Sequence, residues 1–173
     1  MRGFVHCYTG NGKGKTTAAL GLSLRAAGHG KKVLIIQFMK GNIEYGELNG
    51  IKMLSPYALI KQFGRESFVS KDNPEQTDIE LAVKGLLYAK EKIESDEYDI
   101  IVLDEINVAI DFKLIELEKV IKIIKNKPER LELILTGRYA DKKILELCDL
   151  ITEMKEVKHY YYNNITGRQG IEY

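Results

Sequence analysis

The chain has 173 residues, of which 45% are hydrophobic and 29% charged, and its formal net charge is +1 at pH 7. This length and composition predict one soluble domain, residues 1–173, large enough to bury a substantial core. The near-neutral charge argues against a broad nucleic-acid-binding surface, and no apolar run is long enough to span a membrane. A strand-like run starts almost at the first residue and no signal-peptide pattern precedes it, so we expect a cytoplasmic protein.

The cysteines and histidines indicate neither a disulfide nor a zinc site. Cys7 and Cys148 lie far apart in the sequence in apolar surroundings, so we expect buried thiols. His6 falls inside a strand-like run, His29 follows a helix-like run, and His159 lies near the C-terminus. Each histidine is expected to be structural, because none follows a predicted strand at the edge of the sheet.

The first chemical motif is a glycine-rich turn between a strand and a helix. The apolar run at 4–8 predicts a buried strand, and residues 18–27 predict a helix. The turn between them, residues 9–17, reads TGNGKGKTT. Its glycines let backbone N–H groups converge on an anion, and the helix N-terminus adds unpaired donors. The sequence therefore predicts a phosphate-binding loop in preference to an ordinary surface turn.

The side chains of this loop indicate a nucleoside triphosphate with Mg²⁺ or Mn²⁺. Lys15 is placed to reach terminal phosphate oxygens, and the hydroxyl of Thr16 is placed to ligate the cation. The usual motif begins with glycine, whereas this loop begins with Thr9. The residues expected to contact the nucleotide here are Thr9, Gly10, Asn11, Gly12, Lys13, Gly14, Lys15, Thr16 and Thr17.

A second apolar run at 33–38 completes a β-α-β unit. The chain then leaves the sheet through residues 40–42, at the carboxyl edge where ligands bind in open α/β sheets. Residues 41–73 show little periodicity. Within them we expect a short strand at 51–54 and a long loop, which is either functional or simply packed on the surface. A helix is expected to start at residues 73–74, Asn-Pro.

The second chemical motif is a Walker B pattern. An apolar run at 98–103 predicts a strand, and Asp104 and Glu105 follow it directly. At the carboxyl edge of the sheet these carboxylates can bind Mg²⁺ directly or through water. Many strands end in acidic residues, so the pattern carries weight because it accompanies the phosphate loop.

The remaining chain continues the alternation of helices and strands. A helix is expected over 114–124, a strand at 131–135, a short helix capped by Asp141, and a last strand at 150–154. The alternation predicts an α/β fold of the P-loop NTPase (RecA-like) type, with three layers and a mainly parallel central sheet flanked by helices. Arg138 follows one of these strands, where it either binds a phosphate or forms a surface salt bridge.

These residues predict a Mg²⁺–nucleoside triphosphate site but leave the reaction open. Hydrolysis requires a residue that positions water, and a kinase requires a base near an acceptor hydroxyl; Glu105 suits either role. A P-loop nucleotide hydrolase, a small-molecule kinase and a non-catalytic ATP-binding regulator are therefore all alternatives at this point.

The order of motifs resembles the ATP:corrinoid adenosyltransferases of the CobA/BtuR type. A loop that begins with threonine and contains a lysine is specific to this family among P-loop proteins. The resemblance spans essentially the whole chain. It rests on the segments 9–19, 25–31 (RAAGHGK), 33–41, 102–107 (VLDEIN), 136–138 (TGR), 152–154 (TEM), 157–159 (VKH) and 170–173 (GIEY).

The resemblance implies that cob(I)alamin or a corrinoid precursor attacks the 5′ carbon of ATP and that triphosphate leaves. Co(I) is already a strong nucleophile, so no general base is needed. The leaving triphosphate needs charge stabilisation, which Lys13, Lys15 and Mg²⁺ would supply. The residues implied as catalytic are Lys15, Thr16 and Glu105. Thr16 and Glu105 resemble the family's Mg²⁺ contacts, and Asp104 is the further metal contact expected from the Walker B pattern.

The resemblance also implies the substrate contacts and the partners. Arg25 and Arg138 correspond to arginines on the nucleotide side. Phe68, in the loop 63–68, is the candidate for a corrinoid contact. The family further implies a homodimer and a reductase partner that supplies Co(I).

Overall fold

The computed structural model describes residues 2–41 and 45–173. Six strands form one all-parallel sheet in the order β3-β2-β4-β5-β1-β6. The strands are β1 (Val5–Thr9), β2 (Val33–Phe38), β3 (Ala58–Phe63), β4 (Ile100–Asp104), β5 (Glu132–Thr136) and β6 (Leu150–Glu153). The helices are α1 (Lys15–Ala27), α2 (Gly46–Lys52), α3 (Gln76–Glu94), α4 (Ile106–Asp111), α5 (Leu117–Asn126), α6 (Lys142–Leu145) and the 3₁₀ helix η1 (Tyr160–Asn163).

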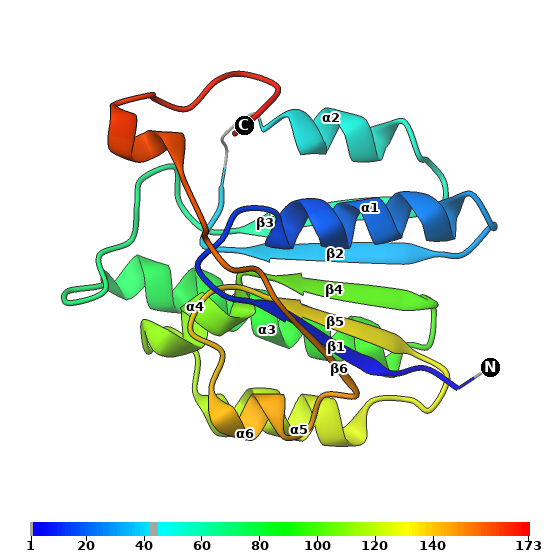
Figure 1. The fold of residues 1–173 in the computed structure, drawn as a ribbon. Coiled ribbons are helices and arrows are strands. Elements are labelled where there is room, and N and C mark those ends of the chain that lie inside the picture. Colours follow the sequence, from blue (N-terminus) through cyan, green and yellow to red (C-terminus); the bar gives the residue numbers. More distant parts are fainter. Residues whose placement is uncertain (1, 42–44) are drawn as a thin grey trace.

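The molecule has three layers, as expected. Helices α1 and α2 cover one face of the sheet, and α3, α4, α5 and α6 cover the other (Figure 1). All six residues of β2 are buried, because helices cover this strand on both faces. The core beneath α1 and α2 includes Ala19, Ala26, Val33, Ile35, Ile51, Val102 and Ile134, and the larger core on the other face includes Leu34, Phe38, Leu86, Leu103, Ile106, Val120 and Leu133.

The strands expected at 4–8, 33–38, 98–103, 131–135 and 150–154 are all present, whereas the segment between β2 and α3 was predicted wrongly. Residues 51–54 do not form a strand. They lie at the end of α2 and in the turn that follows it, and Ile51 of α2 packs into the core. A short apolar run does not distinguish a helix from a strand by periodicity, which explains the error.

The third strand lies where we expected a loop. β3 is an edge strand that pairs only with β2, and its polar residues Lys61 and Gln62 interrupt the apolar pattern. Helix α3 also starts later than the Asn-Pro pair at 73–74 indicated. Glu75 caps it, and a capping box with Asp78 satisfies the first backbone donors. The chain was expected to leave the sheet through residues 40–42. Residue 42 lies outside the described residues.

The helix expected over 114–124 begins only at Leu117, and α4 precedes it without having been predicted. The expected cap of α6 is confirmed, because the Asp141 carboxylate accepts a hydrogen bond of 2.8 Å from the backbone N–H of Lys143.

Cys7 is buried, Cys148 is half-buried, and both are free thiols. In the described part of the chain, no helix combines the length and the hydrophobicity that crossing a membrane requires.

The parallel sheet brings four chain segments to one edge. Because all strands run in the same direction, the residues that follow β1, β2, β4 and β5 meet at the carboxyl edge. The phosphate loop follows β1 and the carboxylate pair ends β4. Strand β5 lies between these two strands, and its last residue, Thr136, therefore stands between the two motifs.

Candidate active site

The glycines of the phosphate loop are required by close packing as well as by backbone conformation. Gly10 and Gly14 have φ angles of 94° and 113°, in the left-handed region. A Cβ atom on Gly10 or Gly12 would lie 2.6 or 2.7 Å from the carbonyl oxygen of Met154. The backbone N–H of Gly12 donates to that same oxygen at 2.6 Å. The chain that leaves β6 thus fixes the shape of the loop.

Lys15 lies folded over its own loop. Its ammonium donates to the carbonyl oxygens of Gly10 and Gly12 at 2.9 and 2.7 Å. Burial lowers the pKa of Lys15, although the nearby Glu105 carboxylate acts in the opposite direction. An ammonium has three donors, so the two loop carbonyls leave one for a phosphate oxygen.

Asp104 is fully buried, and four hydrogen-bond donors, from α1, from β5 and from β2 and its end, surround its carboxylate. Oδ1 accepts from the hydroxyls of Thr16 and Thr136 at 2.8 and 2.7 Å. Oδ2 accepts from the Gln37 amide at 3.1 Å and from the Lys40 ammonium at 3.2 Å. A buried carboxylate needs such partners, so Asp104 holds the edge of the sheet together.

Glu105 differs from its neighbour in conformation and in environment. It has a φ angle of 63°, which is uncommon for a residue with a side chain, and its N–H donates to the Thr136 hydroxyl at 3.0 Å. Burial and the adjacent Asp104 charge raise the pKa of Glu105. Within the described part of the chain its carboxylate accepts no hydrogen bond, so it is available to a ligand.

A pocket of about 480 Å³ lies over the phosphate loop, and we call it the phosphate pocket. The loop and the start of α1 form its floor, the start of α2 forms one wall, and the C-terminal residues form another. Three lysines and three glutamates balance one another in its lining. The lining residues are Lys13, Gly14, Lys15, Thr16, Thr17, Leu20, Lys40, Tyr45, Gly46, Glu47, Glu105, Gly170, Ile171, Glu172 and Tyr173.

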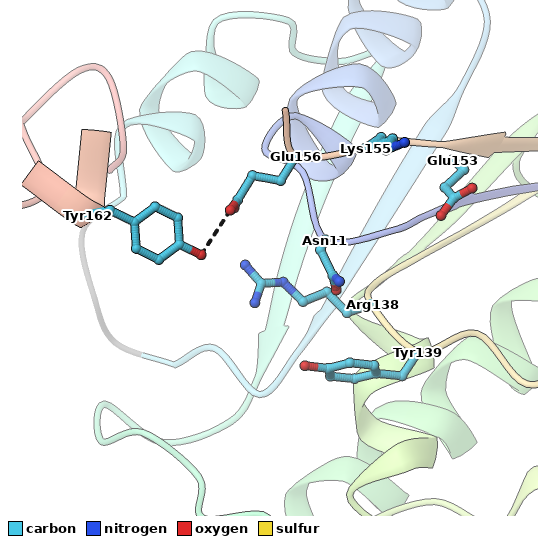
Figure 2. A pocket seen from close by; sticks show the side chains of 7 residues that line it. All are labelled: Asn11, Arg138, Tyr139, Glu153, Lys155, Glu156 and Tyr162. Atoms are coloured by element: carbon cyan, nitrogen blue, oxygen red, sulfur yellow. Dashed lines mark hydrogen bonds between the residues drawn. The ribbon is translucent and has the colours of Figure 1, made fainter. Parts of the chain in front are cut away.

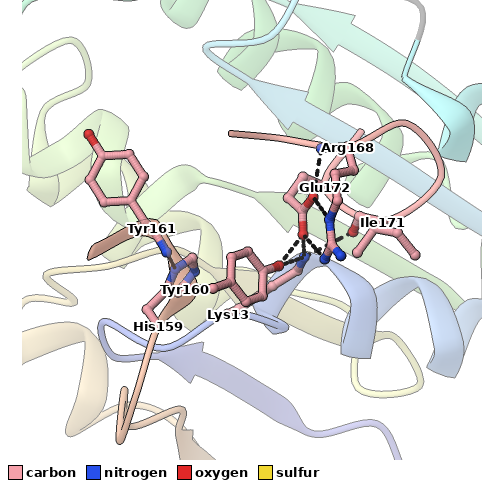
Figure 3. Close-up of polar contacts among 7 residues, drawn as sticks. All are labelled: Lys13, His159, Tyr160, Tyr161, Arg168, Ile171 and Glu172. Atoms are coloured by element: carbon pink, nitrogen blue, oxygen red, sulfur yellow. Dashed lines mark hydrogen bonds and ion pairs between the residues drawn. The ribbon is translucent and has the colours of Figure 1, made fainter. Parts of the chain in front are cut away.

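The C-terminal segment is fastened to the loop through Lys13 (Figure 3). The Lys13 ammonium donates to the Glu172 carboxylate at 2.7 Å, to the Ile171 carbonyl at 2.9 Å and to the Tyr160 hydroxyl at 3.3 Å. Arg168 also pairs with Glu172, at 3.2 Å. The Arg168 guanidinium, with Lys13 and Tyr160, holds the pKa of Glu172 well below its usual range. All three donors of Lys13 are therefore engaged by this segment.

Two more pockets continue along the same edge. One, of about 440 Å³, lies beside the phosphate pocket, and Lys40, Tyr45 and Glu105 line both. We call it the second pocket; its other lining residues are Phe38, Met39, Arg65, Glu66, Ser67, Phe68, Val69, Val108, Phe112, Arg138 and Tyr139. A third pocket, of about 570 Å³, shares Arg138 and Tyr139 with it. Figure 2 shows Arg138 in this third pocket, between Asn11 and Tyr162.

Comparison with known proteins gives the family of the chain. The family described as ATP:corrinoid adenosyltransferase BtuR/CobO/CobP matches residues 1–173, which is the whole chain. The chain belongs to this family. It is accordingly a transferase, and its substrates are ATP and a corrinoid.

Individual relatives support the family assignment over nearly the whole length. The chain is 35% identical to the corrinoid adenosyltransferase of Escherichia coli K12 over 172 residues, which cover 99% of this chain and 86% of that protein. It is 34% identical to the corrinoid adenosyltransferase CobA of Salmonella typhimurium, with the same coverage. Among solved structures, a KaiC-like protein from Pyrococcus horikoshii matches with a TM-score of 0.59 at 16% identity, covering 91% of this chain and 75% of that one. This likeness supports the RecA-like fold.

The structure brings together most of the residues that the sequence singled out. Thr16, Asp104 and Glu105 meet at the loop, and Arg138 lines the second and third pockets. No ion pair of Arg138 occurs within residues 2–41 and 45–173, so the salt-bridge alternative finds no support there. Phe68 is fully exposed and lines the second pocket.

Arg25 lies apart from the loop. It stands in the last turn of α1, ten residues after Lys15, which corresponds to about 15 Å along the helix axis. Arg25 lines none of the three pockets described here. A nucleotide contact by Arg25 stays a prediction.

The side chains at the loop fit a magnesium ion that is held partly by its nucleotide. The Thr16 hydroxyl and the Glu105 carboxylate are oxygen ligands of the kind that Mg²⁺ prefers. Across residues 2–41 and 45–173, no three His, Cys, Asp or Glu side chains come close enough to hold a metal by themselves. Mg²⁺ commonly uses one or two protein ligands together with phosphate oxygens and water, so this donor set suits it.

Sequence reasoning missed several residues of this edge. Lys40 and Glu47 line the phosphate pocket, Gln37 and Thr136 hold Asp104, and Glu172 holds Lys13. Gln37 carried a usable signal, because it is the one polar residue in the buried run of β2. Lys40 carried another, since it follows a strand just as the acidic pair does. For Glu172 no local pattern indicated a contact with the loop.

Proposed function

We propose that this chain transfers the 5′-deoxyadenosyl group of ATP to the cobalt of cob(I)alamin or a corrinoid precursor and releases triphosphate. The electron pair of Co(I) forms the new cobalt–carbon bond, and the bond between C5′ and its oxygen breaks. The triphosphate leaves with that electron pair. The observation that carries the proposal is the junction of two pockets at Lys40, Tyr45 and Glu105, one over a phosphate loop and one beside it.

The phosphate pocket suits a triphosphate that acts as a leaving group. Lys15 has one donor left for phosphate oxygens, and the first turn of α1, whose backbone N–H groups have no partner within the helix, lines the same pocket. Thr16 and Glu105 would hold Mg²⁺, which neutralises charge on the triphosphate when it is bound. The Asp104 carboxylate accepts a hydrogen bond from the Thr16 hydroxyl and so orients it, and Asp104 would contact the cation through water. Stabilising negative charge on the departing group is what accelerates such a displacement.

The second pocket suits the corrinoid. Phe68, Phe112 and Tyr139 line it and offer aromatic surface to an apolar macrocycle. Phe68 belongs to the loop after β3, which the family resemblance connects with the corrinoid. Arg138 lies where this pocket meets the third one and is available to an anionic group of either substrate.

We also infer three features that follow from the reaction or the family. The reaction consumes Co(I), so a reductase partner must supply it. A homodimer agrees with the family likeness, and Leu150 and Ile151 of the edge strand β6 are 43% and 49% exposed. The cytoplasm is the compartment where a strong reductant and ATP occur together.

An anaerobic assay tests the proposed function. The protein is mixed with Mg-ATP and chemically reduced cob(I)alamin, the visible spectrum is followed, and the phosphate products are separated. We expect adenosylcobalamin and triphosphate in equal amounts, and no turnover when a chelator removes the metal. Steady release of phosphate or ADP without any change of the corrinoid spectrum would contradict the proposal and support a hydrolase or a kinase.

A further inference from the structure

Lys40 occupies the boundary between the phosphate pocket and the second pocket. Three residues line both pockets, namely Lys40, Tyr45 and Glu105, and Lys40 is the cation among them. Its ammonium lies 3.2 Å from Asp104 Oδ2, 3.6 Å from Glu47 Oε1 and 5.4 Å from the centre of the Tyr45 ring. The ammonium is therefore held by contacts on several sides, at the point where the two pockets meet.

The backbone and the neighbouring charges keep this ammonium in place. Met39 adopts a φ angle of 59° directly after β2, and its N–H donates to the Phe63 carbonyl at 3.0 Å, which fixes the turn that carries Lys40. The Lys40 side chain is 19% exposed. Burial by itself would lower the pKa of Lys40, but the Asp104 and Glu47 carboxylates outweigh it and raise the pKa. The two carboxylates thus hold the ammonium at the boundary between the pockets.

Asp104 does not depend on Lys40 alone. Its carboxylate also accepts hydrogen bonds from Thr16, Thr136 and Gln37, all of them uncharged donors. The Lys40 ammonium can therefore turn toward a ligand in the pocket without leaving Asp104 bare of partners. If Lys40 served only as a partner for the buried carboxylate, it would not need to line both pockets.

The reaction requires a positive charge at this boundary. The 5′ carbon is the atom that the nucleotide presents to the corrinoid, so it must lie where the two pockets meet. The oxygen that leaves carbon 5′ must lie there too, and it gains negative charge as the bond breaks. Lys13 and Lys15 line the phosphate pocket only, and Arg138 lines the second and third pockets only. Lys40, in contrast, lines both the phosphate pocket and the second pocket.

We propose that Lys40 is a catalytic residue for adenosyl transfer, whose ammonium binds the end of the triphosphate that separates from C5′. The inference rests on the proposed function. In the step the Co(I) electron pair forms the cobalt–carbon bond, the pair of the breaking bond stays on the departing oxygen, and no proton moves. The negative charge at that oxygen is larger after cleavage than before, so the ammonium binds the transition state more tightly than ATP and raises kcat.

The test compares Lys40→Met with wild type and with Lys84→Met, an exposed lysine of α3 as the matched control. Methionine keeps most of the length of the side chain and removes its charge. Single-turnover transfer to cob(I)alamin is measured with saturating Mg-ATP. We expect the rate of Lys40→Met to fall about 10²- to 10³-fold, as for the loss of one group that stabilises transition-state charge. Lys40→Arg should recover part of the rate, and Lys84→Met should transfer at the wild-type rate.

A binding measurement separates this role from a merely structural one. The dissociation constants of Mg-ATP and of inorganic triphosphate are measured by calorimetry. We expect Lys40→Met to weaken triphosphate at least about tenfold more than it weakens Mg-ATP, because triphosphate carries the extra charge at the departing end. Equal weakening of both ligands, or a transfer rate within about threefold of wild type, would overturn the inference.

The proposed function and this inference fail in different ways. If wild-type protein transfers no adenosyl group, the proposed function is wrong whatever Lys40 does. If wild type is active and Lys40→Met retains its rate, Lys40 is only a counter-ion of Asp104. Should Lys40→Met not fold, Lys40→Gln keeps a hydrogen-bond donor for Asp104 and serves in the same two measurements.

Discussion

The hydroxyl of Thr16 donates a hydrogen bond of 2.8 Å to Oδ1 of Asp104, 88 residues further along the chain. This contact joins the first turn of α1 to the end of β4 across the intervening strand β5, whose Thr136 hydroxyl donates to the same oxygen at 2.7 Å. Hydrogen bonds therefore connect the phosphate loop directly to the acidic pair. Such a preorganised site costs little reorganisation when the nucleotide arrives.

Replacing Thr16 with valine should disturb both ends of this contact. The change removes a donor to a buried carboxylate, so we expect a loss of about 1–3 kcal/mol in the free energy of unfolding, measured by urea denaturation. It also removes the proposed magnesium ligand, so Mg-ATP should bind at least about 10-fold more weakly. Thr16→Ser keeps the hydroxyl and should lie close to wild type in both measurements. Equal behaviour of the valine and serine variants would argue against the role of the hydroxyl.

Replacing Lys15 with alanine should abolish turnover while the protein stays folded. The ammonium is held by the carbonyls of Gly10 and Gly12 and has one remaining donor for the triphosphate. We expect the rate of adenosyl transfer to fall by at least about 10²-fold in the anaerobic assay. An activity within about tenfold of wild type would show that Lys15 does not stabilise the leaving group.

Gly12 and Gly21 form a matched pair for testing the loop. A Cβ atom on Gly12 would lie 2.7 Å from the Met154 carbonyl oxygen, whereas one on Gly21, in α1, meets nothing within 4 Å. Gly12→Ala should therefore lower the free energy of unfolding by about 1–3 kcal/mol and weaken ATP binding. Gly21→Ala should stabilise the helix by about 0.5–1 kcal/mol, seen as a rise of a few degrees in Tm. A similar loss of stability in both variants would contradict the packing argument.

Glu172→Gln should release the C-terminal segment from the loop, because it removes the charge that Lys13 and Arg168 share. Hydrogen exchange of residues 160–173 should rise in this variant, while Glu94→Gln, which affects only a surface pair with Lys90, should leave it unchanged. Unaltered exchange in Glu172→Gln would mean that apolar packing, not charge, holds the segment.

The same contact predicts a pH dependence. The folded pKa of Glu172 is lower than its unfolded value of about 4.3, so docking stabilises the protein fully above that value. The stabilisation is lost as the pH falls below about 4.3 toward the folded pKa. Exchange of residues 160–173 should therefore increase in wild type below pH 4.3, and Glu172→Gln should show no such increase.

Local patterns predicted the strands best where helices cover the sheet on both faces. The run of β2 is apolar except for Gln37 because every position is buried, and such a run is read directly from the sequence. β3 escaped prediction because it is an edge strand with exposed positions, where Lys61 costs little. The start of α3 was misplaced for a different reason. The helix begins at the capping box formed by Glu75 and Asp78, not at the Asn-Pro pair before it.

The sequence predicted many residues of the candidate site but not the different environments of Asp104 and Glu105. The two acidic residues after β4 look equivalent in the sequence. In the fold, four donors surround Asp104, whereas Glu105 turns through a left-handed conformation toward two pockets. Nothing local distinguishes them, because the donors come from segments that lie 32 to 88 residues away.

The sequence by itself determined the phosphate loop, the acidic pair, the alternation of strands and helices, and the family. The first three depend on neighbours within a few positions, where glycine conformation, helix periodicity and burial act directly on the choice of residue. The family follows from the order of such local motifs along the whole chain. The tertiary structure alone decided that Lys40 stands between two pockets and that Glu172 holds Lys13. Those relations depend on which strands lie side by side and on how the chain returns over the sheet, and only the packing of the whole domain sets both.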